Sequence, residues 1–172
     1  LEFLRKLIKP ILKSGIGYDI HQFDKNSKNG LKLCGIKIPF SKLIGHSDAD
    51  VGLHAICDSI FGALSMRDIG YHFPDTNKKW KNADSSKFLI FCKEKLIDKG
   101  FIINNLDINI IAEKPKITKY IPVMKKRIAR LLSISSKYVS IKATTNEKIG
   151  FIGNGEGIAA EAIVQISNEF YN

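Results

Sequence analysis

Short stretches in which apolar and polar residues alternate predict the strands of this chain. In residues 101–112 every second residue from Leu106 to Ala112 is apolar, including Ile108 and Ile110, and the residues between them are mostly polar, as in a half-buried strand. The stretch around Gly35 is predicted to be a strand or short hairpin with a bend at that glycine, ended by Pro39. The other predicted strands are residues 13–20, 31–38, 138–145 and 158–166.

Longer stretches in which apolar residues recur every three or four positions predict three helices. Serine and aspartate precede the first two, and these are the residue types that cap helix N-termini. Gly100 is a suitable residue to end the second helix. The predicted helices run from a cap at Ser47 or Asp48 to about Leu64, from a cap at residues 84–86 to Lys99, and from Thr118 to about Ser133.

This order of elements predicts an α/β or α+β fold with a single mixed β-sheet and helices packed on one side of it. At 172 residues the chain is long enough for one domain with a sizeable core. We assign residues 13–172 to that domain. Residues 1–12 begin without Met and are interpreted as an N-terminal extension, either an engineered start or the remnant of a targeting segment.

The net charge of +10 comes from 27 Lys and Arg against 17 Asp and Glu. A solvated basic surface explains it, and attraction to a phosphorylated ligand is the sharper interpretation. No long basic block interleaved with aromatic residues argues for nucleic acid as a partner, and no apolar run is long enough to span a membrane. We therefore expect neither a nucleic-acid nor a membrane partner.

The three cysteines, Cys34, Cys57 and Cys92, are odd in number and widely spaced. A disulfide framework is not expected from them, and a reducing compartment is. Their apolar surroundings predict small core residues.

The first candidate chemistry is Asp19-Ile20-His21, at the end of the first predicted strand. Residues two apart in a strand project to one face, so Asp19 and His21 point the same way. A carboxylate and an imidazole are two of the three protein ligands of an open zinc site. The tripeptide alone is a weak signal, and the third ligand is either His46 or His54.

The first predicted helix adds two kinds of chemistry. His54 lies four residues after Asp50 and four before Asp58, so the three side chains share a helix face. Free backbone N–H groups at the start of the helix would make an anion site, with His46 and Ser47 beside it.

The irregular segment of residues 66–82 is long for a loop in a compact domain, which favours a functional role. Asp68 and Asp75 could accept hydrogen bonds from ligand hydroxyls, and the alternative for Asp75 is a simple turn after Pro74. The glycines from Gly150 onward do not form a dinucleotide-binding motif between a strand and a helix.

Several motifs together resemble one known family. They are GYDIHQF, IGHSDADVGLHAICDSIFGALSMRDIGYHFPDT, DINIIAEKPKI and IKATTNEKIGFIGNGEGIAAEA, in this order. The chain from about Lys13 onward resembles the 2-C-methyl-D-erythritol 2,4-cyclodiphosphate synthase family of the non-mevalonate isoprenoid pathway. The resemblance implies a mixed α/β homotrimer with active sites between subunits.

It also implies the reaction. The substrate would be 4-diphosphocytidyl-2-C-methyl-D-erythritol 2-phosphate, whose 2-phosphate attacks its own β-phosphorus to give a cyclic diphosphate and CMP. The implied cofactors are Zn²⁺ and a second divalent cation, Mg²⁺ or Mn²⁺. Implied zinc ligands are Asp19, His21 and His54, Glu147 would carry the second cation, and His46 with Thr145 would stabilise the transition state.

The resemblance further implies which residues contact the substrate. His46 and Ser47 would touch phosphates, and residues 112–118 with 143–145 would form the cytidine pocket. The implied substrate-binding set is Asp19, Ile20, His21, His46, Ser47, Asp68, Ile69, Gly70, Phe73, Pro74, Asp75, Thr76, Asn77, Ala112, Glu113, Lys114, Pro115, Lys116, Ile117, Thr118, Ala143, Thr144, Thr145, Asn146, Glu147, Phe151 and Asn154.

Asn154 departs from the family, which commonly has Arg there in a turn lining a central cavity able to hold an isoprenoid diphosphate. The extension at residues 1–12 and the Lys, Asn and Ile bias favour a plastid-type organelle, with a bacterial cytoplasm as the alternative. Asp58 would be a partner that orients a metal ligand, or a surface carboxylate.

Two other functions are weighed against this one. A zinc phosphohydrolase of nucleoside diphosphate esters would use the same Asp-His-His cluster with water as the nucleophile. A basic nucleic-acid-binding domain would need no metal, and would leave the 68–77 loop without a purpose.

Overall fold

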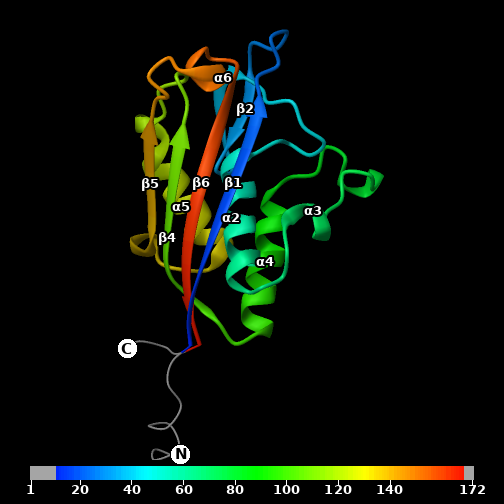
Figure 1. Cartoon of the computed structure of the whole chain (residues 1–172), viewed down its shortest axis with the longest axis vertical. Helices are drawn as coiled ribbons and strands as arrows, with labels where there is room; N and C mark the ends of the chain where they lie inside the picture. The colour runs from blue at the N-terminus through cyan, green and yellow to red at the C-terminus, as the bar shows by residue number, and fades with distance from the viewer. Residues whose placement is uncertain (1–10, 169–172) are drawn as a thin grey trace, which may run out of the picture.

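The structure is a computed structural model and describes residues 11–168. Its main layer is a four-stranded mixed sheet with strand order β1-β6-β4-β5 (Figure 1). Helices α2 and α5 pack on one face of this sheet, and α4 packs against both helices. The strands are β1 (Leu12–Gln22), β4 (Ile102–Ile111), β5 (Val139–Thr144) and β6 (Gly157–Ser167). The longer helices are α2 (Val51–Ala63), α4 (Ser86–Asp98) and α5 (Ile121–Leu132).

Strand pairing follows from the connections. β6 lies antiparallel between β1 and β4, whereas β4 and β5 run parallel because α5 and its flanking 3₁₀ turns return the chain to the same end of the sheet. Those turns are η2 (Thr118–Tyr120) and η3 (Ser136–Tyr138). The alternation predicted for β4 is confirmed, since Ile108 and Ile110 are buried under the helices.

The predicted hairpin forms a separate two-stranded sheet of β2 (Gly30–Leu33) and β3 (Ile36–Ser41). The prediction that Pro39 ends the strand is wrong. The register shifts between Gly30 and Leu31, and Pro39 pairs with no residue, so its missing N–H breaks no ladder hydrogen bond.

The predicted start of the first helix is also wrong. Asp50, and not Ser47 or Asp48, caps α2, and its carboxylate accepts the Leu53 N–H at 3.0 Å. The helix therefore begins two or three residues later than Ser47 and Asp48 suggest.

Two segments predicted to be irregular contain short turns of helix. Residues 66–82 include α3 (Ile69–His72) and η1 (Lys78–Trp80), and the glycine region includes α6 (Gly150–Gly153). A single turn is too short for a hydrophobic period to show in the sequence. The second predicted helix is confirmed, with Gly100 in a left-handed conformation just beyond it.

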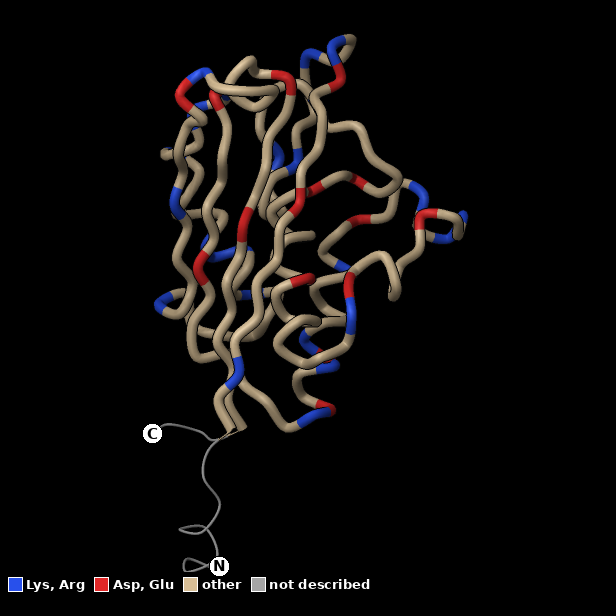
Figure 2. The backbone as a smooth tube through the Cα atoms, in the orientation of Figure 1, with Lys and Arg blue, Asp and Glu red and all other residues tan. Residues whose placement is uncertain are grey.

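The predicted fold class is confirmed as one mixed sheet with helices on one side, to which the small β2-β3 sheet is added. Most of the predicted extension, residues 1–10, lies outside the described residues, and Leu12 already pairs with Ser167 in the sheet. Within the described part no helix is both long and apolar enough to cross a bilayer. Lys and Arg are distributed over many elements and form no single block (Figure 2).

The position of β1 on α2 depends on two glycines without side chains. A Cβ at Gly17 would lie 2.0 Å from the Ala55 carbonyl oxygen, and one at Gly15 would lie 1.9 Å from that of Ser59. Both contacts are with helix backbone, which cannot rotate away. The two glycines therefore let the strand and the helix approach closely.

We expect Gly17→Ala to lower the free energy of unfolding by about 3 kcal/mol or more, because overpacking against backbone forces the strand off the helix. Urea unfolding followed by circular dichroism measures it. Gly62→Ala is the matched control, since its Cβ would make only ordinary van der Waals contacts, with the Ile16 carbonyl oxygen at 3.7 Å and the Gly15 Cα at 3.9 Å. That variant should be neutral or more stable by up to about 1 kcal/mol because alanine favours a helix interior. Equal effects of the two changes would contradict the close approach.

Candidate active site

Asp19 and His21 of β1 and His54 of α2 meet where the strand crosses the helix. Asp19 Oδ2 lies 2.9 Å from His54 Nδ1 and 3.0 Å from His21 Nε2. The two imidazole nitrogens are 3.3 Å apart. One ligand atom from each residue lies within 4.8 Å of the others, so the three side chains converge as a metal-binding group would require.

The outer nitrogens of both histidines have fixed partners. His21 Nδ1 lies 2.9 Å from the Ile44 carbonyl oxygen, which can only accept, so this nitrogen carries a proton, and in the neutral imidazole Nε2 has the lone pair that a cation needs. His54 Nε2 lies 2.8 Å from Ser85 Oγ and 3.2 Å from Ser47 Oγ. Such partners orient metal-binding imidazoles. One carboxylate and two imidazoles with the remaining position open are a fitting donor set for a catalytic zinc-type ion.

The electrostatics of the cluster keep Asp19 ionised. Burial would raise the pKa of Asp19, but hydrogen bonds from His21 and His54 hold it well below its usual range. For His21, burial lowers the pKa, but the hydrogen bond to Asp19, the negative charge of Asp19 and the hydrogen bond to the Ile44 carbonyl together outweigh it and raise the pKa. Asp19 is therefore the ionised carboxylate of the three candidate ligands, held between two imidazoles.

A cavity of about 230 Å³ opens beside this cluster. Predicted residues that line it are His21, His46, Ser47, His54, Ile69, Gly70, Phe73 and Asp75. Its apolar wall also contains Trp80 and Phe88, which the sequence analysis missed. Phe73 stacks on Phe88 with ring centroids 4.3 Å apart and meets Trp80 edge-on at 5.0 Å. The single tryptophan of the chain, in a segment already suspected of function, was the available signal.

A second cavity of about 150 Å³ lies at the ends of β4 and β5. It is lined by Ile110, Ala112, Pro115, Lys116, Ile117, Thr118, Ala143, Thr144 and Thr145, all but Ile110 predicted. Glu113 supports this region, since its Oε1 accepts the backbone N–H groups of Asn146 at 3.0 Å and Lys148 at 3.2 Å. The Thr145 hydroxyl donates to Glu147 Oε1 at 2.7 Å, which brings these two predicted residues together.

No residue lines both cavities, so within one chain the predicted site forms two separate groups. Asp19 belongs to the cluster of candidate ligands without lining a cavity, and Ile20 lies on the opposite face of β1. The other predicted residues that line neither cavity are Asp68, Pro74, Thr76, Asn77, Glu113, Lys114, Asn146, Glu147, Phe151 and Asn154.

Some predicted residues have structural partners. Asp68 caps α3 by accepting the Tyr71 N–H at 2.8 Å, and the Asn77 carbonyl oxygen lies 3.3 Å from His46 Nε2. Asp58 was predicted to orient a metal ligand or to be a surface carboxylate. In the structure it is half-buried and accepts the Ile69 N–H at 2.6 Å, which ties α3 to α2.

A third, larger cavity of about 850 Å³ lies between the β2-β3 sheet and the loop before α2. It shares Ser47 with the cavity beside the metal cluster, and Lys32, Lys37 and Lys42 give it a basic lining. It is not predictable from the sequence, because its lysines are separated along the chain and come together only when the hairpin folds.

The fold and the cluster define a class of protein, a mixed α/β domain with a candidate single-metal centre beside a ligand-sized cavity. Comparison with known proteins narrows this. Residues 12–167 match the model of the YgbB family, and the chain belongs to that family.

Curated relatives carry enzyme names. The chain is 51% identical over 166 residues to the 2-C-methyl-D-erythritol 2,4-cyclodiphosphate synthase of Ehrlichia ruminantium, covering 94% of this chain and 96% of that one. It is 51% identical over 160 residues to the bifunctional enzyme IspD/IspF of Granulibacter bethesdensis, covering 92% of this chain and 42% of that protein. These relatives are bacterial and lend no support to the predicted plastid-type organelle.

Solved structures agree with this assignment. The fold matches the bifunctional IspDF from Campylobacter jejuni with a TM-score of 0.88 at 38% identity, covering 92% of this chain and 43% of that chain. It matches the CDP complex of IspF from Plasmodium falciparum with a TM-score of 0.80 at 36% identity, covering 90% of this chain and 95% of that one.

We expect His54→Ala to abolish tight binding of a divalent metal, because two remaining ligands do not make a stable site. Elemental analysis after dialysis against trace metal should fall from about one ion per chain to near zero. His46→Ala is the control and should keep the ion, since His46 lies outside the cluster. Wild-type metal content in His54→Ala would contradict the site.

Proposed function

We propose that this protein is a 2-C-methyl-D-erythritol 2,4-cyclodiphosphate synthase, a lyase of isoprenoid biosynthesis. The observation that carries the proposal is 51% identity, over almost the whole of both chains, to a curated relative of that name. The enzyme converts 4-diphosphocytidyl-2-C-methyl-D-erythritol 2-phosphate to the cyclic diphosphate and CMP. The CDP bound in the Plasmodium falciparum neighbour favours a cytidine nucleotide over nucleic acid as the ligand class.

Asp19, His21 and His54 would hold zinc, and the proposal is supported by their convergence and by the hydrogen-bond partners of the outer histidine nitrogens. Glu147 would hold Mg²⁺ or Mn²⁺, hard cations that often bind through one carboxylate and substrate phosphates. When bound, the two ions would neutralise phosphate charge and polarise the phosphoryl group.

The protein's own residues would bind the substrate and align its phosphates. The nucleophile is a phosphate that is already anionic, so the site needs no strong base and works by positioning the two phosphates. His46 and Ser47 line the cavity beside the cluster and would contact phosphate there, while Ile69, Gly70 and Phe73 would hold the methylerythritol part.

Residues Ala112 to Thr118 with Ala143 to Thr145 would bind the cytidine part. The Thr145 hydroxyl, now bonded to Glu147, would donate to a phosphate oxygen in the transition state. The remaining predicted contacts, from Phe151 and Asn154, belong to α6 and its end, where Asn154 now donates to Glu156 at 3.3 Å.

We further propose that the active site is completed between chains of a homotrimer. Support comes from the separation of two groups of residues. The metal group is the set of candidate ligands with the cavity beside them, and the Thr145 group is the cavity at the ends of β4 and β5; the two cavities share no lining residue within one chain. The sheet face away from the helices also exposes Ile16, Tyr18 and Ile163, an apolar surface suited to contact with other copies.

The proposed compartment is a bacterial cytoplasm and not a plastid-type organelle. The curated bacterial relatives reach 51% identity, whereas the Plasmodium falciparum structure is 36% identical.

Phosphorus NMR of the purified protein with zinc, magnesium and the cytidine substrate should show CMP and two coupled resonances of a cyclic diphosphate. The coupling arises because both phosphorus atoms share one bridging oxygen. CMP with a linear phosphorylated product would mean that water is the nucleophile, and the phosphohydrolase alternative would replace the synthase.

We expect His54→Ala and Thr145→Ala to be nearly inactive alone and active when mixed. If each site takes its metal group from one chain and its Thr145 group from another, a 1:1 mixture of exchanging subunits should recover up to about a quarter of wild-type turnover. A mixture of Thr145→Ala and Glu147→Gln is the control and should recover nothing, because both changes damage the same group. Equal activity of the two mixtures would contradict a shared site.

A further inference from the structure

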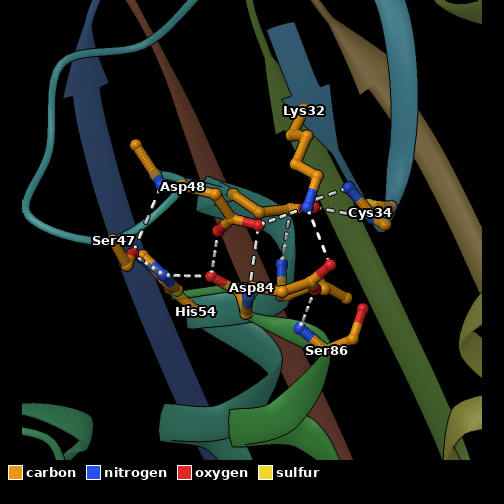
Figure 3. A network of polar contacts seen from close by, with 12 residues as sticks. Lys32, Cys34, Ser47, Asp48, His54, Asp84 and Ser86 are labelled. Carbon is orange, nitrogen blue, oxygen red and sulfur yellow. Dashed lines mark hydrogen bonds and ion pairs between the residues drawn. The ribbon is translucent and has the colours of Figure 1, made fainter. Parts of the chain in front are cut away.

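His54 is joined to a chain of polar contacts that leads away from the metal cluster (Figure 3). Its Nε2 contacts Ser85 Oγ at 2.8 Å, and the Ser85 hydroxyl in turn donates to Asp48 Oδ1. The Ser85 backbone N–H donates to the other oxygen of Asp48 at 3.1 Å. Ser85 is fully buried, and both its hydroxyl and its backbone N–H donate to the carboxylate of Asp48.

The direction of these hydrogen bonds follows from what each group can donate. A carboxylate has no proton, so the Ser85 hydroxyl must donate to Asp48. Having spent its only proton there, the Ser85 oxygen must accept from His54, which places the His54 proton on Nε2. In the neutral imidazole, which is the form that binds a metal, the lone pair is then on Nδ1, the nitrogen that lies 2.9 Å from Asp19 Oδ2.

Asp48 is itself clamped. Lys32 of β2 donates to Asp48 Oδ2 at 2.7 Å and to Asp84 Oδ2 at 2.9 Å. Burial would lower the pKa of Lys32, and the hydrogen bonds to the two carboxylates raise it. For Asp84, burial raises the pKa, while the hydrogen bond from Lys32 and one from the Ser86 N–H bring it down to about 2. Both partners stay charged, and the clamp links β2 to the start of α4.

We propose that Ser85 and Asp48 are positioning residues for metal binding, which hold His54 with Nδ1 facing the ion, and that Lys32 and Asp84 hold Asp48. The inference rests on the metal centre of the proposed function. It extends the site by the Ser85 hydroxyl and the Asp48 carboxylate. Neither residue is one of the three candidate metal ligands, and neither lines the proposed cytidine pocket. It also couples the metal ion to the basic cavity beside the hairpin, because Lys32 and Asp48 line that cavity.

The test is the affinity of the full chain for Co²⁺ and Zn²⁺ without substrate, measured by competition with a chelator. Ser85→Ala should weaken binding about 10- to 100-fold, the usual effect of losing a group that orients a metal ligand. The visible spectrum of the Co²⁺ form should change because the imidazole turns. Ser47 Oγ, at 3.2 Å from the same nitrogen, would retain part of the orientation.

Asp48→Asn is the second variant, which removes the charge and disturbs the Lys32 clamp while keeping the side-chain shape. It should weaken Co²⁺ binding in the same direction. Ser59→Ala is the matched control. Ser59 of α2 is fully buried like Ser85, but its hydroxyl donates to the Ile56 carbonyl and takes no part in the relay of hydrogen bonds from His54 through Ser85 to Asp48. It should bind Co²⁺ as the wild type does. Excess zinc should restore turnover to Ser85→Ala and Asp48→Asn, since their defect is affinity.

Wild-type affinity and spectrum in both relay variants, or an equal loss in Ser59→Ala, would overturn the inference while leaving the synthase function intact. Conversely, a wild type that forms no cyclic diphosphate, with metal binding still weakened in Ser85→Ala, would overturn the function and support the relay. Circular dichroism of the metal-free variants shows that each one is folded, and Asp48→Asn carries the test if Ser85→Ala is not.

Discussion

The contact between the backbone of β1 and that of α2 is the constraint on which the site depends. Gly15 lies against Ser59 and Ala63, and Gly17 lies against Ala55 and Ser59. Two residues along a strand rise about 6.6 Å and four along a helix about 6 Å, so each step of two in β1 matches one turn of α2 in the opposite direction. The next two residues on this strand face are Asp19 and His21, and the next turn of the helix carries His54. The same packing that excludes side chains at the glycines therefore brings the three candidate ligands together.

A second group of interactions fixes the start of α2, where buried charges gather. Asp50 is fully buried. Its carboxylate accepts the backbone N–H groups of Cys34 and Gly35 at 2.7 and 2.6 Å, in addition to the Leu53 N–H that it caps. Burial raises its pKa, and the backbone hydrogen bonds oppose that rise. A carboxylate in this position is tolerated only with such partners. It joins the β2-β3 turn to the helix, and the Lys32 clamp joins the same hairpin to α4, so both sides of His54 are anchored.

Periodic elements were predictable from the sequence, and so was the pair of Asp19 and His21, because both depend on local spacing alone. The helix start was not, since Ser47, Asp48 and Asp50 are all suitable caps and only the fold shows that Asp48 serves Ser85 and Lys32. Spacing along the chain likewise could not choose between His46 and His54 as the third candidate ligand. That choice depends on which residue faces β1, a tertiary property. Trp80 and Phe88 were missed for the same reason.

The exposed apolar side chains on the outer face of the sheet fit the proposed trimer. In the proposed trimer the metal group of one chain must meet the Thr145 group of another, and a shared site of this kind requires a fixed angle between subunits. A sheet face carrying Ile16 and Ile163, which pair across β1 and β6, is rigid because its strands are hydrogen-bonded to one another. A rigid apolar face sets subunit orientation more accurately than loops would. The sheet would thus serve both halves of the site, by carrying Asp19 and His21 towards the helices and by presenting its other face to neighbouring chains.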